Sequence, residues 1–140
     1  MTIQESENKI VEEFSYFEDW MDKYNYIIEL GKTLSAIDEE YRQDKYLIVG
    51  CQSNVWLQAE LIDGKVSFKA DSDAIITKGI ISLLIRVLSE RTPDEILSAP
   101  LTYLETIGLT KHLSPTRSNG LLSMVKQMKV YAMAYKSKLG

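Results

Sequence analysis

The chain has one cysteine and one histidine among its 140 residues, and this scarcity excludes several kinds of site. The single thiol, Cys51, can form neither an internal disulfide nor a CxxC dithiol. Iron–sulfur clusters are normally held by several thiolates, and zinc sites rich in cysteine or histidine need several such ligands, so one copy of the chain can build neither. Any thiol chemistry at Cys51 therefore needs a second molecule, because no other thiol of the chain can react with it.

Long apolar runs are also missing. None approaches the ~20 residues that a membrane-spanning helix needs, and the first residues, Met1-Thr-Ile-Gln-Glu-Ser-Glu, are too acidic and polar for a signal peptide. We therefore expect a soluble, cytoplasmic protein with no membrane association. Hydrophobic content of 45% and charged content of 26% are typical of globular chains, and the length fits a single domain over residues 1–140.

Charge is distributed unevenly along the chain. The net charge is −4, but residues 1–40 carry a balance of −8 and residues 111–140 a balance of +6. The two ends could attract each other across the fold, or the basic end could form a surface for an acidic partner. The overall acidity disfavours binding to nucleic acid.

Apolar residues at helical spacing predict the first two helices. Ile10, Phe14, Phe17 and Met21 recur on one face of an amphipathic helix, and a second helix is expected after Asp22.

Capping signals mark the later helices. The most apolar helix runs to Leu88, and either Ser72 or Asp73 is expected to cap its first turn. Thr92-Pro-Asp-Glu95 is a capping box that predicts a short helix over about residues 93–98. Residues 109–120 are rich in hydroxyl side chains and are predicted to form a loop before a long final helix.

Three apolar segments predict the sheet. Residues 46–49 are apolar throughout and are expected to form a buried strand. Residues 55–61 alternate with period two, Asp63-Gly64 supplies a hairpin turn, and residues 66–70 form the returning strand. The predicted fold class is therefore α/β (α+β), with a small antiparallel sheet of about three strands packed against helices.

The stretch with most chemical interest is the turn that carries Cys51. Gly50 permits a backbone shape that a side chain would forbid, and Gln52, Ser53 and Asn54 add polar groups and backbone N–H donors, so the turn could present the thiol at a loop tip. The alternative is that Cys51 is a small hydrophobic residue of the core.

Two other side chains could act with Cys51. A cation such as Arg117 would favour the reactive thiolate if it lay close to Cys51. A thiol hydrolase would need His112 in contact with Cys51, and no spacing rule shows that contact. There is no GxSxG elbow and no phosphate-binding glycine loop.

Four stretches resemble the SufE/CsdE family of sulfur-acceptor proteins in iron–sulfur cluster assembly. They occur in the family's order and are spread over nearly the whole chain. They are Tyr26-Ile-Ile-Glu-Leu-Gly31, Val49-Gly-Cys-Gln-Ser-Asn-Val-Trp-Leu57, Asp71-Ser-Asp-Ala74 with Lys78-Gly79, and His112-Leu-Ser-Pro-Thr-Arg-Ser-Asn-Gly120.

The resemblance implies a fold and a function. The implied fold is that of SufE and the U-type scaffold proteins. The implied function is that Cys51 accepts persulfide sulfur from a pyridoxal-phosphate cysteine desulfurase of the SufS or CsdA type, stimulates that enzyme, and passes the sulfur to a SufBCD-type scaffold. Pyridoxal phosphate (PLP) would belong to the partner, and this chain would bind no cofactor and no metal. The activity would be an accessory sulfurtransferase-like one, not that of a stand-alone desulfurase.

The resemblance also implies supporting residues around the thiol. Gly50, Gln52 and Ser53, with Asp73, His112 and Arg117, would support Cys51 or bind the partner. The alternative function is a non-catalytic regulatory binding module in which Cys51 is structural. Either a monomer or a homodimer is compatible with the sequence.

Overall fold

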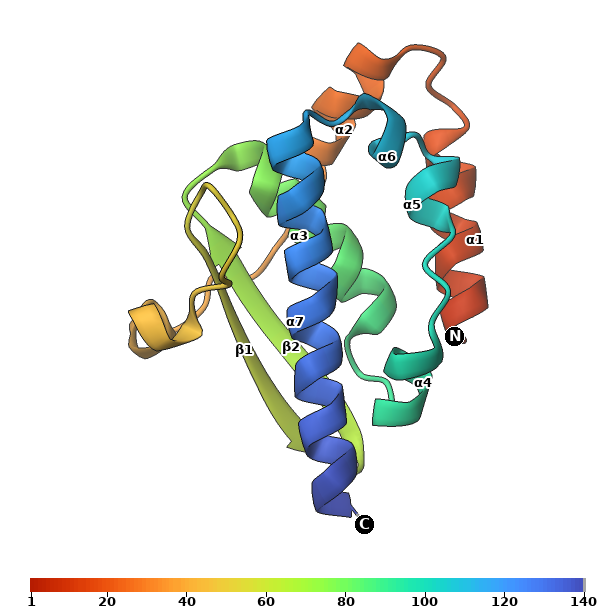
Figure 1. The fold of residues 1–140 in the computed structure, drawn as a ribbon. Helices are drawn as coiled ribbons and strands as arrows, with labels where there is room; N and C mark the ends of the chain where they lie inside the picture. The colour runs from red at the N-terminus through yellow and green to blue at the C-terminus, as the bar shows by residue number, and fades with distance from the viewer. Residues whose placement is uncertain (140) are drawn as a thin grey trace.

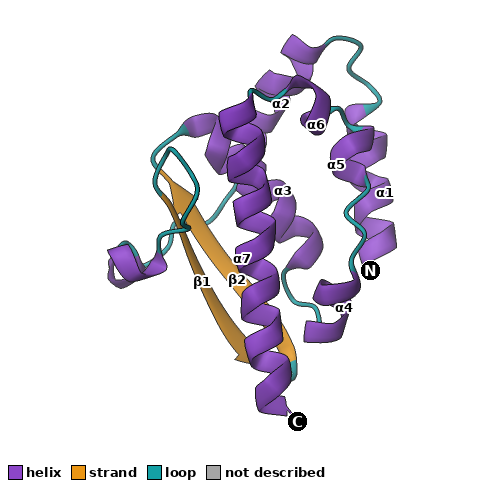
Figure 2. Ribbon diagram, in the orientation of Figure 1, coloured by secondary structure: helices purple, strands orange, loops and turns teal. Residues whose placement is uncertain are grey.

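The computed structural model describes residues 1–139, and over this range the protein has an α+β fold. The fold consists of seven α-helices and one antiparallel β-hairpin, which lies at one edge of the molecule (Figure 1, Figure 2). The elements are α1 (Ile3–Phe14), α2 (Trp20–Lys32), β1 (Val55–Ile62), β2 (Lys65–Ser72), α3 (Ile75–Leu88), α4 (Pro93–Ser98), α5 (Tyr103–Thr106), α6 (Leu109–His112) and α7 (Pro115–Leu139), with two 3₁₀ turns, η1 (Glu39–Tyr41) and η2 (Asp44–Tyr46).

Local sequence signals begin and end several elements as expected. The predicted capping box at Thr92 and Glu95 starts α4, which covers residues 93–98. A second capping box, between Thr2 and Glu5, starts α1. The hairpin turn has positive φ angles at both central residues, 51° at Asp63 and 78° at Gly64, which is the geometry that Asp-Gly sequences favour.

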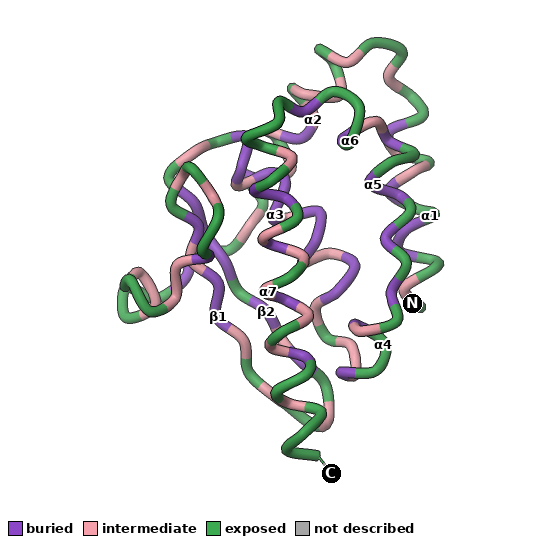
Figure 3. Tube along the Cα trace, viewed as in Figure 1, coloured by how far each residue is buried: buried purple, intermediate pink, exposed green. Residues whose placement is uncertain are grey.

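The core gathers around α3, the most apolar helix. Its buried side chains pack against α2 on one side and against β2 on the other, and each buried Leu or Ile stabilises the fold by about 1.5–3 kcal/mol. The long helix α7 runs beside the hairpin and packs against α4 (Figure 1). The Tyr131 and Tyr135 hydroxyls tie α7 to the sheet, since they donate to the backbone carbonyls of Leu57 and Ala59. In Figure 3, most of α3 is coloured as buried, whereas the last turns of α7 are mostly exposed.

The predicted first helix is interrupted. α1 ends at Phe14, and α2 begins only at Trp20, with the Asp19 side chain accepting a hydrogen bond from the Asp22 N–H. Met21 is therefore on the second helix and is 64% exposed instead of facing the core with Phe14. The apolar spacing continued across a break that Asp19 creates by capping the new helix.

The strand predicted over residues 46–49 is not formed. Tyr46 ends the 3₁₀ turn η2, Leu47 pairs with Trp56 only as an isolated bridge, and Val49 is 90% exposed. Ile48 is buried and its N–H donates to the Val55 carbonyl. The chain leaves the sheet after that single bond, so the described residues contain two strands and not about three.

The loop predicted over residues 109–120 is largely helical. α6 covers Leu109–His112 and α7 begins at Pro115. Pro fits the first position of a helix because its missing N–H would be unpaired there anyway, and the Ser114 hydroxyl caps the turn by accepting from the Arg117 N–H at 3.3 Å.

Residues 1–139 include no helix that is both long enough and apolar enough to span a membrane.

Candidate functional site around Cys51

The Cys51 loop, residues 49–53, lies against the first turns of α7. Gly50 has a φ of 100°, which places the chain in the left-handed region that side chains avoid. A Cβ at this position would also collide with the Ser123 side chain. The Cys51 Sγ lies 3.5 Å from the Gly120 carbonyl oxygen and can donate a weak hydrogen bond to it. Backbone shape and close approach to α7 thus both require glycine at position 50.

The thiol is half-buried beside a small cavity of about 110 Å³. Side chains from α3 and α7 form its apolar wall, and the Cys51 loop and the first turn of α7 supply polar groups. The lining residues are Cys51, Gln52, Ser53, Ala74, Ile76, Thr77, Ile80, Thr116, Arg117, Gly120 and Met124. Water occupies about 30 Å³ in the liquid, so the cavity has room for a small group attached to the sulfur.

Burial raises the pKa of the Cys51 thiol, since taking the sulfur out of water penalises the charged thiolate. Arg117 lines the same cavity. Its guanidinium, however, lies over the Tyr24 ring, 5.8 Å from the ring centre. In this arrangement the cation does not offset the effect of burial on the thiol.

Asp73 fixes the C-terminal end of the Cys51 loop. Its carboxylate accepts from the Asn54 backbone N–H at 3.1 Å and from the Asn54 side-chain amide at 3.0 Å. The Ser72 hydroxyl donates to the Asn54 carbonyl at 2.8 Å and accepts from the Ala74 N–H. The expectation that Ser72 or Asp73 caps the first turn of α3 is wrong: α3 starts after Ala74 without a side-chain cap, the Ser72 hydroxyl reaches only the Ala74 N–H, and Asp73 bonds to Asn54.

His112 does not join Cys51. It is on α6, and its ring stacks on Trp20 with centres 4.7 Å apart and planes 12° from parallel. It is not among the residues that line the Cys51 cavity. The arrangement therefore gives no support to a thiol hydrolase that pairs Cys51 with His112.

Three residues that were not among the predicted site residues also shape this site. Asn54 donates to the Asp73 carboxylate, a Cβ on Gly50 would meet Ser123, and Met124 lines the cavity. The exposed Gln52 and half-buried Ser53, which were singled out, do line it. Asn54 had a local signal, since it stands in the same polar turn as Cys51, whereas the α7 residues had none.

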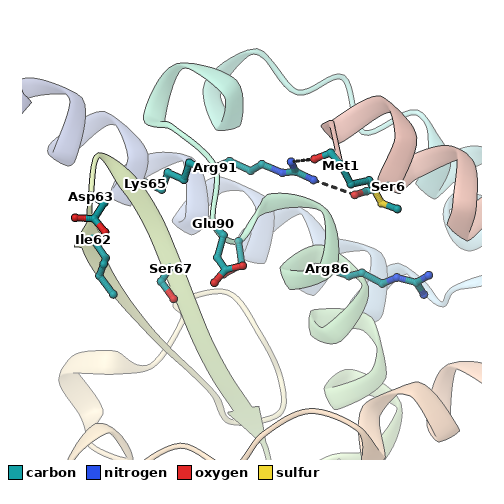
Figure 4. Close-up of a pocket in the computed structure, with 10 residues that line it drawn as sticks. Met1, Ser6, Ile62, Asp63, Lys65, Ser67, Arg86, Glu90 and Arg91 are labelled. Atoms are coloured by element: carbon teal, nitrogen blue, oxygen red, sulfur yellow. Dashed lines mark hydrogen bonds between the residues drawn. The ribbon is translucent and has the colours of Figure 1, made fainter.

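A larger cavity, of about 740 Å³, lies at the other end of the hairpin (Figure 4). Its arginines already have partners: Arg91 donates to the Met1 carbonyl and the Ser6 hydroxyl, and Arg86 is paired with Glu13. It contains no thiol. Residues 1–139 also include no group of three or more His, Cys, Asp or Glu side chains placed to hold a metal ion.

The fold and the site together define a small α+β protein that holds one thiol on a loop, in a cavity beside a long helix. The chain belongs to the SufE family: the family model described as "SufE: Fe-S metabolism associated domain" matches residues 8–132. Membership gives the protein a role in iron–sulfur metabolism.

A solved structure supports the fold independently. The chain is similar to the solution structure of a hypothetical protein from Thermus thermophilus, with a TM-score of 0.77 and 17% sequence identity. The match covers 94% of this chain and 96% of the other. At this identity the likeness concerns the fold alone.

Proposed function

We propose that this protein accepts sulfur on Cys51 from a PLP-dependent cysteine desulfurase and carries it to an iron–sulfur scaffold. The observation that carries the proposal is the placement of the chain's one thiol. Cys51 is half-buried beside a cavity of about 110 Å³, on a loop held through hydrogen bonds and not by a covalent or metal link. A thiol so placed can hold an extra sulfur atom away from water.

The chemistry is an exchange between thiolates. The Cys51 thiolate attacks the outer sulfur of a persulfide on the partner, a new S–S bond forms at Cys51, and the partner's cysteine leaves as its thiolate. The proton of the persulfide stays on the outer sulfur, and no oxidant or reductant is consumed. The absence of a second cysteine in this chain suits the task, because a neighbouring thiol would convert the persulfide into a disulfide.

The isolated protein holds the thiol in a protected state. Burial raises the pKa of Cys51, so attack requires the loop to leave its position on α7 or a cation to approach. Arg117 lines the cavity, and its guanidinium lies over the Tyr24 ring. We therefore assign Arg117 the role of stabilising the thiolate or persulfide when the partner is bound.

Arg117→Ala tests that role, with Arg117→Lys as the variant that keeps the charge. The sulfur-transfer rate should fall in Arg117→Ala and be partly restored in Arg117→Lys. If Arg117→Ala leaves both the transfer rate and the Cys51 pKa in the complex unchanged, the assignment is wrong.

The partners follow from the same proposal. The donor would be a desulfurase of the SufS or CsdA type that carries its own PLP, and the acceptor a SufBCD-type scaffold. The Cys51 loop, with Asp73 and Arg117, would form the docking face.

The second candidate is a regulatory binding module in which Cys51 is structural. The contact of its thiol with Gly120 and its half-burial favour this reading. The carrier and the binding module predict different results in a turnover assay that measures alanine released by a PLP-dependent cysteine desulfurase. The proposed carrier should stimulate alanine release in the presence of reductant, and Cys51→Ser should abolish the stimulation. Stimulation that survives in Cys51→Ser would favour the binding module.

A further inference from the structure

Two carboxylates, Asp71 and Asp73, lie at the end of β2, beside the start of β1, where Asp71 pairs in register with Trp56. Asp73 is exposed and holds Asn54, after the cysteine. Asp71 is only 3% exposed, and its environment is charged. One of its oxygens, Oδ2, is paired with the Arg42 guanidinium, and the other, Oδ1, lies 3.2 Å from the Lys78 ammonium. The Ser72 N–H also donates to Asp71, at 2.8 Å.

Arg42 belongs to the segment that leads into the Cys51 loop. We call residues 38–48 the strap; they contain both 3₁₀ turns and run directly into Val49. Figure 1 shows the strap projecting beside β1. Arg42 is its charged link to the sheet, because its guanidinium binds Asp71 and also lies over the Trp56 ring, 5.3 Å from the ring centre.

Few other contacts hold the strap in place. Residues 38–40 and 43–45 are exposed, and the aromatic contact between Tyr41 and Tyr46 is internal to the strap. Both 3₁₀ turns touch β1, and the last two residues join the sheet through the Leu47–Trp56 bridge and the buried Ile48. Arg42 supplies the charged contact that holds the part of the strap before Leu47 against the sheet.

We propose that Asp71 is a positioning residue: through Arg42 it fixes the strap, and through the strap it keeps the N-terminal end of the Cys51 loop on α7. This role rests on the proposed function of Cys51. Asp71 and Asp73 divide the task, since one fixes the chain before the thiol and the other fixes it after.

The burial of Asp71 makes its ion pair with Arg42 costly to break. A charge taken out of water is costly unless it is paired, so removing one partner is penalised far more than at the surface. Glu39 offers the contrast. It lies 3.7 Å from the Arg42 Nε, but its side chain is 88% exposed, and such exposed pairs contribute little.

The two oxygens of Asp71 permit a matched comparison. Lys78 lies on α3 and holds Asp71 to the core, whereas Arg42 holds it to the strap. Loss of Lys78 should leave the strap in place, and loss of Arg42 should release it.

The experiment measures the rate at which iodoacetamide alkylates Cys51 in the isolated, folded protein. Arg42→Gln should raise the rate by about tenfold, because local opening of the loop exposes the sulfur. Glu39→Gln should change it by less than about twofold, because its ion pair with Arg42 is exposed. Lys78→Gln should lower the overall stability, because it removes a partner of the buried Asp71, but it should also change the alkylation rate by less than about twofold, because Asp71 keeps its pairing with Arg42. Amide hydrogen exchange should accelerate over residues 38–53 in Arg42→Gln and stay unchanged in α3, a pattern that a general loss of stability would not produce.

Measuring the rate across pH separates loop opening from a change in the thiol pKa. Opening raises the limiting rate at high pH, whereas a change of pKa only moves the midpoint. If Arg42→Gln does not fold, Arg42→Lys replaces it; the lysine keeps the charge but lacks the planar group that stacks on Trp56, and the rate should still rise.

A folded Arg42 variant with the wild-type limiting rate would overturn the proposal, as would an equal increase in Lys78→Gln. The assay uses no sulfur donor. Its result therefore stands apart from sulfur transfer: faster alkylation without sulfur uptake by the wild type would leave Asp71 as the anchor and refute the carrier function alone.

Discussion

Glycine brings two segments close together in each of two regions, and the two contacts differ in what surrounds them. Between α2 and α3, a Cβ on Gly31 would come within 2.7 Å of the Gly79 backbone nitrogen, and one on Gly79 would collide with the Ile27 carbonyl. Between the Cys51 loop and α7, a Cβ on Gly50 would meet the Ser123 side chain. The first contact joins backbone to backbone, and the second joins backbone to a side chain.

We infer from this difference that the α2–α3 contact is rigid, whereas the Cys51 loop can move away from α7. Backbone atoms within packed helices cannot move aside, so α2 and α3 keep their positions. A serine side chain can rotate, and the polar contacts that hold the Cys51 loop can exchange with water. The protein therefore combines a fixed helical body with a thiol that it can present to a partner.

The largest effect is expected where the α2–α3 contact is broken. Gly79→Ala should lower the free energy of unfolding by about 3 kcal/mol, because overpacking against backbone forces the helices apart. Chemical denaturation measures this loss. Gly64→Ala is the control: it lies in the open hairpin turn with no atom near its Cβ, so only its positive φ should cost about 1–2 kcal/mol. Equal losses in both variants would contradict the rigid contact.

An ion pair strengthens the same rigid region. The Arg86 guanidinium holds the pKa of the Glu13 carboxyl below its usual range, and Tyr26 also donates to that carboxyl. Because the folded pKa is depressed, the contribution to stability is present above the ordinary pKa of about 4.3 and is lost as pH falls through the folded value.

Glu13→Gln should therefore lower the free energy of unfolding by about 1 kcal/mol at pH 7, and the difference from wild type should shrink towards pH 3. The exposed neighbour on α1, Glu12→Gln, is the control and should have almost no effect. A difference for Glu13→Gln that does not change between pH 7 and pH 3 would exclude the ion pair as its source.

Breaking the contact of the Cys51 loop with α7 should lower the free energy of unfolding less than breaking the α2–α3 contact. It should have a larger effect on the reactivity of the Cys51 thiol. Gly50→Ala adds strain at a φ of 100° and displaces the Ser123 hydroxyl. The free energy of unfolding should therefore fall by about 1–2 kcal/mol. Cys51 should then react faster with iodoacetamide, because the loop no longer rests on α7. The double variant Gly50→Ala with Ser123→Ala should recover part of the lost stability, because it removes the hydroxyl that the new Cβ would meet. A wild-type alkylation rate in folded Gly50→Ala would show that this contact does not restrain the loop.

The smallest change is the pH profile of the thiol itself. Burial raises the pKa of Cys51, so the midpoint of its alkylation rate should lie above that of an unstructured peptide containing cysteine. Variants that open the loop should move the midpoint down towards the peptide. A wild-type midpoint at or below the peptide value would mean that the thiol is not held in the buried arrangement.

Local signals in the sequence were sufficient for some elements and not for others. The capping box at Thr92 and the Asp63-Gly64 turn depend on neighbouring residues alone, and both were predicted correctly. The apolar run at 46–49 was misread as a strand because only Ile48 finds a place in the core. Its neighbour Val49 is 90% exposed and lies outside the sheet, where the chain turns at Gly50.

The site was predictable where its residues adjoin Cys51 and not where they come from afar. Gln52 and Ser53 were chosen because they stand beside the thiol, and the family resemblance pointed to Arg117. Nothing local distinguishes a helix-capping Asp73 from one that binds Asn54, 19 residues earlier. Asp71 stands in one of the stretches that resemble the family, but its buried pairing with Arg42 emerges only from the fold.

The most direct test of the central claim is the intact mass of the protein after incubation with a PLP-dependent cysteine desulfurase and cysteine. We expect a gain of one or more sulfur atoms, about 32 Da each, that a reductant removes and that Cys51→Ser lacks. An unchanged mass, with a cognate desulfurase of proven activity, would contradict the account and leave Cys51 as a packing residue of a binding module.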